Sequence, residues 1–356
     1  MSDLNDIQNI VKFDNGNILE SIRNLYNQII FAWEETYSYQ FPNDYNYLNN
    51  IIVSGMGGSA LGGRIVDSLL FNNLRTPLEI ISDYKVPNYV DSRTFFISSS
   101  YSGNTQENIN STIEAQKKGA KIFGITTGGE LEEYFKKEEL EYYKIDPKYN
   151  LSNQPRYALG YSIGSILGIL SKCNYINWQQ EIFENIKENI DTVVNDFDIN
   201  ATVDKNIAKS ISIKLKDHIP VIVASEHLVG SAYAFKNHLN ESSKSFSLMF
   251  EIPDLNHHLM EGLSNPFNAR MLYKFIFIES NLYLSKNSQR YRVTEDVVSK
   301  NSVSYLIYNC VLNSKFEQAV EVLYLALFVS FYLAYLYGVD ASKIPWVDYF
   351  KKTLNE

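Results

Sequence analysis

The sequence predicts an α/β protein with doubly wound parallel sheets flanked by helices, and three observations lead to this class. Short runs of β-branched and aromatic residues alternate with longer segments of helical periodicity. Two of these runs end in loops rich in glycine and hydroxyl groups, at residues 54–63 and 98–106. The connections are short, which places such loops at the carboxyl ends of parallel strands, where ligands bind.

Length and composition predict a globular protein of two domains. The chain has 356 residues, of which 45% are hydrophobic and 21% charged. Its formal net charge of −9 and the lack of a basic run argue against a nucleic-acid partner. No signal peptide is evident, and Cys173 and Cys310 are the only cysteines. We therefore expect a cytoplasmic protein with reduced thiols.

The first domain is expected within residues 1–150. A helix with one apolar stripe is predicted at residues 17–33. The predicted strands lie at residues 51–53, 78–81, 94–97 and 121–125, and the predicted helices that accompany them lie at residues 104–118 and 130–141.

The second domain is expected at residues 151–356, after the polar stretch 146–154. Its predicted strands lie at residues 221–224, 246–250, 275–278 and 304–308. The two halves therefore resemble two versions of one plan. The apolar stretch 322–337 is shorter than the roughly 20 residues that cross a bilayer. Because Gly338 follows it as a C-cap, we expect a core or subunit-interface helix.

The loop at residues 98–106 has the composition of a binding site for a tetrahedral anion. Ser100, Ser102 and Thr105 offer hydroxyl groups, and Gly103 permits a turn before the next helix. The N–H groups and the dipole of a helix start favour a phosphate. The loop has no lysine, so the pattern indicates a phosphomonoester held by neutral donors rather than a P-loop triphosphate site.

The loop after residues 51–53 leaves two interpretations open. Its glycines let the backbone approach a ligand closely. Gly55, Gly57 and Ala60 also match a dinucleotide-binding fingerprint, although no acidic residue clearly ends the next strand. Farther on, Pro155 suits the first turn of a helix and Arg156 follows it. A cation at a helix start opposes the dipole, which suggests that a negative group compensates it.

Six stretches in a fixed order carry a family resemblance. They are residues 55–60 (GMGGSA), 100–105 (SYSGNT), 155–161 (PRYALGY), 239–244 (LNESSK), 256–262 (NHHLMEG) and 338–351, which contains GVD and VDYFK. With these stretches the chain resembles the bifunctional phosphoglucose/phosphomannose isomerases, a branch of the sugar-isomerase (SIS) domain proteins.

The resemblance implies two SIS domains, a homodimer and no metal or other cofactor. The implied reaction is the aldose–ketose isomerisation of glucose 6-phosphate or mannose 6-phosphate with fructose 6-phosphate, a step of glycolysis and gluconeogenesis. The residues implied to hold the substrate phosphate are Gly57, Gly58, Ser59, Ser100, Ser102 and Thr105.

The resemblance also assigns catalytic roles. Glu241 is implied as the base that moves a proton between C1 and C2, and Arg156 is the cation available to the enediolate oxygen. His257, reaching the site from the neighbouring subunit, resembles with Lys351 the pair that opens the sugar ring. Lys352 is the alternative to Lys351.

Some positions depart from the family pattern, and two other functions remain open. His258 stands beside His257 where asparagine is usual, and Ser342 is a candidate for a hydroxyl near C2 that is not securely aligned. A metal site formed with Glu261 is disfavoured, because adjacent histidines on a helix point to different faces. The alternative functions are a non-catalytic sugar-phosphate sensor and an NAD-dependent oxidoreductase. The preference between glucose and mannose stays open.

Overall fold

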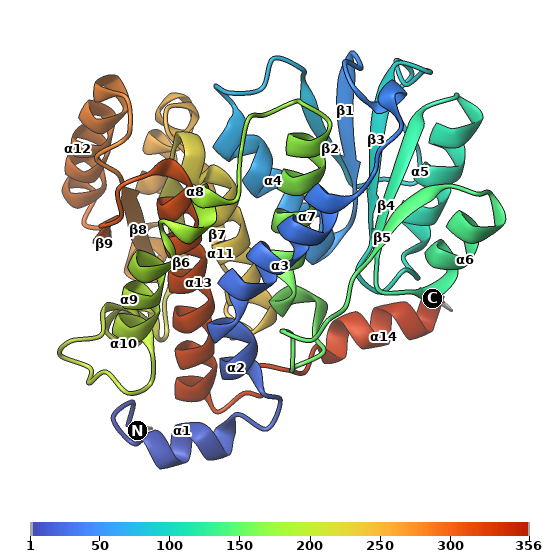
Figure 1. Ribbon diagram of the computed structural model, residues 1–356. Helices are drawn as coiled ribbons and strands as arrows, with labels where there is room; N and C mark the ends of the chain where they lie inside the picture. Colours follow the sequence, from blue (N-terminus) through green and yellow to red (C-terminus); the bar gives the residue numbers. More distant parts are fainter. Residues whose placement is uncertain (1–2, 355–356) are drawn as a thin grey trace. The chain divides into compact units, whose positions relative to one another are not determined.

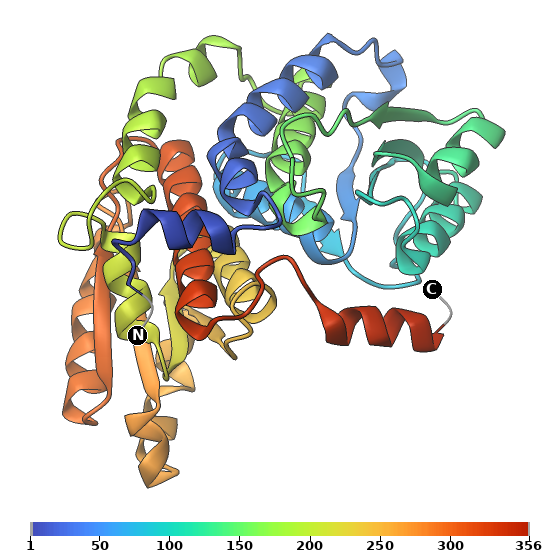
Figure 2. The same cartoon turned by 90° about the horizontal axis from the view of Figure 1, so that it is seen from below.

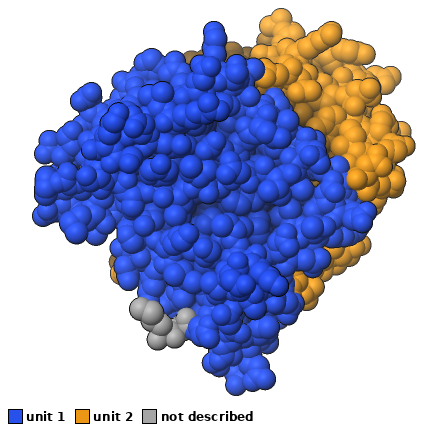
Figure 3. All heavy atoms as spheres, turned by 90° about the vertical axis from the view of Figure 1, so that its left-hand side faces the viewer, with its two compact units in different colours: residues 1–18, 186–343 blue, residues 19–185, 344–356 orange. Residues whose placement is uncertain are grey.

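In the computed structural model, which describes residues 3–354, the chain forms two compact units, each built on one parallel sheet (Figure 1). Unit 1 comprises residues 3–18 and 186–343, and unit 2 comprises residues 19–185 and 344–354; Figure 3 colours them separately. The predicted class of two parallel sheets flanked by helices is confirmed.

Unit 2 contains a five-stranded sheet in the order β2-β1-β3-β4-β5, and every neighbouring pair is parallel. Its strands are β1 (Asn50–Ser54), β2 (Leu78–Ile81), β3 (Thr94–Ser99), β4 (Lys121–Thr126) and β5 (Glu141–Lys144). Its helices are α2 (Ile18–Arg23), which starts at the unit boundary, α3 (Leu25–Ser38), α4 (Gly57–Leu70), α5 (Gln106–Lys117), α6 (Gly129–Lys137), α7 (Leu159–Lys172), α8 (Glu181–Glu184) and α14 (Pro345–Leu354).

Alternate residues of the central strands of unit 2 pack on opposite faces of the sheet. Ile52, Phe96 and Ile122 lie in one buried cluster with Ile109 of α5 and Phe135 of α6. Helices α3, α4 and α7 lie on the other side of the sheet (Figure 1). A parallel sheet covered on both faces leaves the ends of its strands as the places open to ligands.

The close packing of α3 against α7 sets the extent of unit 2, and Figure 2 shows the two helices side by side. Three glycines lie four residues apart on one face of α7. A Cβ at Gly160 would lie 2.4 Å from the Leu25 carbonyl oxygen, and one at Gly164 would lie 2.1 Å from the Ile29 carbonyl oxygen. Residues 151–185 therefore belong with the first sheet, so the division differs from the boundary expected near residue 150.

Unit 1 repeats this plan with a four-stranded parallel sheet in the order β7-β6-β8-β9. The order matches that of the first four strands of unit 2. Its strands are β6 (Ile219–Ala224), β7 (Leu248–Glu251), β8 (Tyr273–Glu279) and β9 (Ser304–Asn309). Its helices are α1 (Ile7–Phe13), α9 (Lys187–Phe197), α10 (Ile207–Leu215), α11 (Val229–Glu241), α12 (Ser285–Lys300) and α13 (Lys315–Tyr337).

Helix α13 is the apolar helix expected from the sequence, although it begins seven residues earlier, at Lys315. A capping box between Ser314 and Glu317 fixes its start, and Gly338 ends it in the left-handed conformation with φ of 68°. By length and composition it could cross a membrane, but 94% of its most apolar window is buried inside the protein. It is therefore a core helix.

The sequence pattern is wrong about the segment after α6. The predicted helix at residues 130–141 ends at Lys137, and Glu139 takes a left-handed φ of 52° that turns the chain into β5. Strand β5 pairs with β4 and lies at the end of the sheet order. Its sequence EYYK combines aromatic residues with charges, which suits a strand on an exposed sheet edge.

Glu279 at the end of β8 and Glu295 of α12 form a pair of carboxyl groups in unit 1. Burial, followed by the hydrogen bond and the negative charge of Glu279, raises the pKa of Glu295 to about 7. Because the pKa of Glu295 is higher in the folded state than in the unfolded state, its contribution to stability is fully present below about pH 4.5. This contribution is lost as the pH rises through about 7.

We expect the free energy of unfolding to fall by on the order of 1 kcal/mol between about pH 5 and about pH 8, since partial exposure screens the repulsion. Glu295→Gln should remove this fall. Urea midpoints at the two pH values test the expectation, with Glu188→Gln on an exposed face of α9 as the control. The expectation is contradicted if the urea midpoint of the unsubstituted protein is the same at both pH values. It is also contradicted if the midpoint of Glu295→Gln still falls between them.

Candidate active site

Two helix N-termini face the same end of the unit 2 sheet, where β1 and β3 lie side by side. Helix α4 begins directly after β1, and α5 begins after the loop that follows β3. The N-cap residues Met56 and Thr105 make no side-chain capping hydrogen bond within the described chain. The first-turn N–H groups of both helices therefore have no side-chain cap from these residues. They lie where the strand order reverses, which is where ligands usually bind in such sheets.

The loop between β3 and α5 holds its hydroxyl groups in a network of its own. Ser100 is buried, its Oγ donates to Oγ1 of Thr105 at 3.1 Å, and it accepts from the N–H of Gly103 at 3.2 Å. Oγ of Ser102 accepts from the N–H of Asn104 at 3.3 Å. The structure therefore brings Ser100 and Thr105 together, whereas Ser102 is exposed in the same loop.

The loop that begins α4 contacts both the β3 loop and the segment of Arg156. Oγ of Ser59 accepts from the N–H of Tyr101 at 3.0 Å. A Cβ added at Gly58 would lie 3.2 Å from the carbonyl oxygen of Pro155 and 3.5 Å from Cα of Arg156. Gly57 takes a left-handed φ of 50° at the first position of α4. Glycine at position 58 is thus what allows the two segments to touch.

Arg156 is buried, with 4% of its surface exposed, in the short 3-10 helix Pro155–Tyr157. Its Nη1 donates to Oε1 of Gln154 at 3.2 Å, and its guanidinium lies 5.4 Å from the centre of the Tyr157 ring. Pro155 opens this 3-10 helix rather than α7 itself, which begins at Leu159. The backbone of Arg156 thus adjoins Gly58, and its buried guanidinium places a positive charge in the segment next to the α4 loop.

The structure adds Asn150 and Tyr101, two residues to which the sequence analysis gave no role. Nδ2 of Asn150 donates to the hydroxyl of Tyr101 at 3.0 Å and to the carbonyl of Gln154 at 3.1 Å. Burial raises the pKa of Tyr101. Asn150 therefore ties the β3 loop to the Arg156 segment. No local signal marks this role, because the partners lie 49 residues apart.

In unit 1 the equivalent place is filled by a side chain of the protein. Glu226 follows β6, takes a left-handed φ of 49°, and extends its carboxylate to the start of α12. Its Oε1 accepts from the N–H of Leu284 at 2.8 Å and from Nδ2 of Asn287 at 2.8 Å. A carboxylate at this position repels a phosphate, so this place in unit 1 is poorly suited to an anion.

Glu241 and His257 lie at opposite ends of the unit 1 sheet. Helix α11 starts after the carboxyl end of β6 and returns the chain to the start of β7, so Glu241, its last residue, lies at the amino end. His257 ends the 3-10 helix Asp254–His257 that follows β7, at the carboxyl end, and it is exposed. The 13 residues of α11 span ~20 Å. One copy of unit 1 therefore does not bring this pair together.

Lys351 lies on α14, of which no residue is buried. No side-chain hydrogen bond or ion pair links Lys351 or Lys352 to another of the described residues 3–354. Three large side chains of the same helix are exposed, with 81% of Trp346, 64% of Tyr349 and 57% of Phe350 accessible. This chain alone leaves the apolar surface of α14 uncovered.

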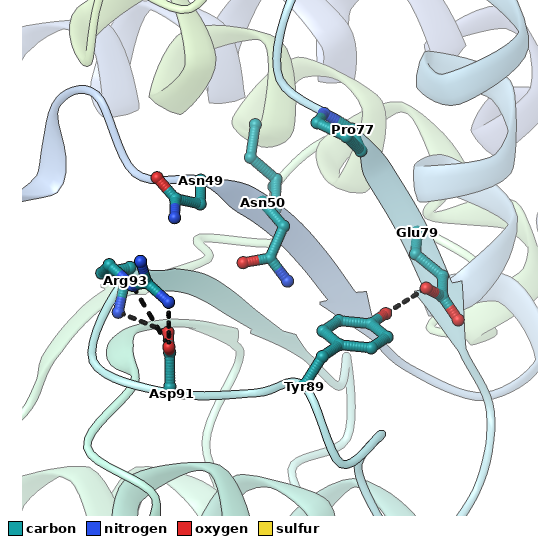
Figure 4. A pocket seen from close by; sticks show the side chains of 8 residues that line it. Asn49, Asn50, Pro77, Glu79, Tyr89, Asp91 and Arg93 are labelled. Carbon is teal, nitrogen blue, oxygen red and sulfur yellow. Dashed lines mark hydrogen bonds and ion pairs between the residues drawn. The ribbon is translucent and has the colours of Figure 1, made fainter.

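Two of the cavities among the described residues of unit 2 differ in position. A small one of about 10 Å³, with room for a water molecule, lies beneath the α4 loop and touches Gly58, Ser59 and Tyr101. A larger one of about 440 Å³ lies at the amino end of the same sheet (Figure 4). Its carboxylates are already bonded, Glu79 to the Tyr89 hydroxyl and Asp91 to Arg93. It offers little to an anionic substrate.

Among residues 3–354, no group of three or more His, Cys, Asp or Glu side chains is arranged to hold a metal ion. Next to the proposed ring-opening residue, Nε2 of His258 lies 3.4 Å from Oδ2 of Asp254. Cys173 and Cys310 are both free and buried, and burial raises the pKa of the Cys173 thiol to about 12. Neither thiol is suited to nucleophilic chemistry.

Comparisons with known proteins show which family the chain resembles. The family model described as the bacterial phospho-glucose isomerase C-terminal SIS domain matches residues 204–354. A bifunctional phosphoglucose/phosphomannose isomerase of Caldicellulosiruptor bescii is 31% identical over 342 residues, covering 95% of this chain and 99% of that protein. A protein of the same name from Aquifex aeolicus is 27% identical over 95% of this chain and 98% of its own.

A solved structure supports the fold independently. The crystal structure of a hypothetical protein from Thermus thermophilus superposes with a TM-score of 0.74 at 15% identity, covering 98% of this chain and 92% of that one. At this identity the likeness concerns the fold alone.

Proposed function

Since this chain belongs to the bifunctional phosphoglucose/phosphomannose isomerase family, we propose that it interconverts glucose 6-phosphate and mannose 6-phosphate with fructose 6-phosphate. The observation that carries the proposal is the pair of helix N-termini at the β1/β3 crevice of unit 2, with hydroxyl groups and a buried arginine beside them. Such a site recognises a phosphomonoester. A reaction on the sugar carbons can then proceed while the phosphate stays bound.

The phosphate is held by the α4 loop and the β3 loop together. Ser59 and Ser100 donate hydroxyl hydrogen bonds, and the backbone N–H groups at Gly57 and Gly58 point at the same anion from the start of α4. Thr105 adds a hydroxyl at the start of α5, as does Ser102 in the same loop. These donors give up the internal hydrogen bonds described above when the phosphate oxygens arrive.

Glu241 acts as the base of the isomerisation. Its carboxylate removes the proton from C2 of the open-chain aldose, which leaves a cis-enediol or enediolate, and returns that proton to C1 to give the ketose. A proton moves between the two oxygens in the same process, so atoms and electrons balance. Arg156 stabilises the negative charge that develops on the oxygen.

Ring opening needs a proton donor and acceptor, and His257 with Lys351 takes this role. We propose that His257 comes from the second subunit of a homodimer. The separation of Glu241 and His257 within one sheet supports this, as does the exposed apolar surface of α14. Free buried cysteines agree with a cytoplasmic location.

The experiment is an assay of the purified protein with fructose 6-phosphate in the presence of EDTA. We expect glucose 6-phosphate and mannose 6-phosphate to form, at rates that EDTA does not change. Binding of hexose 6-phosphates in a calorimeter without turnover would instead indicate a sugar-phosphate sensor. Titration with NADH should give no binding signal, since the glycine loop is assigned to the phosphate.

A further inference from the structure

Lys244 lies three residues beyond Glu241, in the turn that leads from α11 toward β7. Its backbone takes a left-handed φ of 54°, and the residue is exposed. Nζ donates to the carbonyl oxygen of Ser242 at 3.0 Å and to the carbonyl oxygen of Asp340 at 2.5 Å. The amine thus joins two segments of unit 1 that are 96 residues apart in the sequence.

The first of these segments is a packed and hydrogen-bonded turn next to Glu241. The N–H of Ser242 donates to the carbonyl of His238 at 2.8 Å, and Oγ of Ser243 donates to the carbonyl of Leu239 at 2.6 Å. Ser242, Ser243 and Ser245 are buried. Because this turn is packed and hydrogen-bonded, a shift of the Ser242 carbonyl moves the end of α11, and with it the Glu241 side chain.

The second segment begins the C-terminal part of the chain. Oδ1 of Asp340 accepts from the N–H of Ser342 at 2.8 Å and from its Oγ at 2.6 Å. Burial opposes the ionisation of Asp340, but the bonds from Ser342 and the charges of Lys343 and Lys244 outweigh it and lower its pKa. A Cβ at Gly16 would lie 2.9 Å from Cβ of Ser342, so the segment also packs closely on residue 16.

We propose that Lys244 is a positioning residue for the isomerisation, which aligns Glu241 with the segment Asp340–Ser342 that precedes α14 and Lys351. The proposal rests on the proposed function, with Glu241 as the base. An ammonium group suits the task because it has three donors and no acceptor, so it satisfies two carbonyl oxygens at once. Lys244 acts through these carbonyls and does not contact the substrate.

The test compares Lys244→Met, which keeps the aliphatic stem without the donors, with Lys244→Arg, which keeps the donors. Lys343→Met is the matched control, since Lys343 is exposed near Asp340 and its loss changes the net charge equally. We expect Lys244→Met to lower kcat about tenfold, with KM within about twofold. Lys244→Arg should recover most of the rate, and Lys343→Met should match the unsubstituted protein.

A kinetic isotope effect separates positioning from a merely structural role. With glucose 6-phosphate deuterated at C2, a misplaced base slows proton transfer, so the isotope effect on kcat should rise in Lys244→Met and not in the control. Three results would overturn the proposal. The first is a normal kcat in Lys244→Met, and the second is a Lys244→Arg variant as slow as Lys244→Met. The third is a lower rate of Lys244→Met with an unchanged isotope effect and a lowered melting temperature. Failure of the proposed function is distinguishable, because the unsubstituted protein would then lack isomerase activity altogether.

Discussion

Glu241→Gln is expected to lower kcat for the conversion of fructose 6-phosphate to glucose 6-phosphate by about a thousandfold. Glutamine keeps the size of the side chain but cannot accept the proton from carbon, and general-base catalysis contributes roughly 10²–10⁴ in rate. KM should change by less than about twofold, because the phosphate contacts proposed in unit 2 remain. Steady-state kinetics of the purified variant measure both quantities.

The control for this experiment is Glu133→Gln, an exposed glutamate on α6. It makes the same chemical change away from the proposed site, so its kinetics should equal those of the unsubstituted protein. Full activity of Glu241→Gln would remove Glu241 from the mechanism. The proposal for the phosphate site would then still stand, since it depends on other residues.

Gly103→Ala is expected to raise KM for hexose 6-phosphates by about a hundredfold and to lower stability by about 2–4 kcal/mol. Gly103 has a left-handed φ of 70°, and a Cβ there would lie 1.7 Å from the carbonyl oxygen of Gly128. The N–H of Leu131 also donates to the Gly103 carbonyl at 2.9 Å. Alanine therefore displaces the loop that carries Ser100, Ser102 and Thr105. Substrate titrations and thermal unfolding measure the two effects.

Gly119→Ala is the matched control for the β3 loop. Gly119 has a similar φ of 83°, but the nearest atom to its Cβ would be 3.7 Å away. Its backbone strain should cost about 1 kcal/mol in stability and leave KM unchanged. Unaltered substrate binding in Gly103→Ala would mean that the β3 loop does not hold the phosphate.

The strands and the loops that follow them were predictable because their signals are local. β2 (Leu78–Ile81) has the bounds that the sequence predicts, and β3 extends the predicted strand by two residues, to Ser99. The hydroxyl residues of the β3 loop directly follow β3, and the glycines of the α4 loop directly follow β1. β5 was missed because two tyrosines between charged residues fit a helix as well as an edge strand.

Contacts between distant segments could not be predicted from local patterns. The unit boundary depends on the packing of α7 against α3, which joins residues more than 120 positions apart. Two other contacts also join residues that are far apart in the sequence. One is the hydrogen bond from Lys244 to Asp340, and the other is the hydrogen bond that the Glu226 carboxylate accepts at the start of α12. Local patterns therefore predict strands and loops better than they predict the contacts between distant segments.

The most direct test of the central claim is an NMR experiment with fructose 6-phosphate in D₂O. Proton transfer by one carboxylate that exchanges with solvent should yield glucose 6-phosphate and mannose 6-phosphate that carry deuterium at C2. In Glu241→Gln this deuterium should disappear together with the products. Unchanged fructose 6-phosphate after prolonged incubation with the unsubstituted protein would contradict the account.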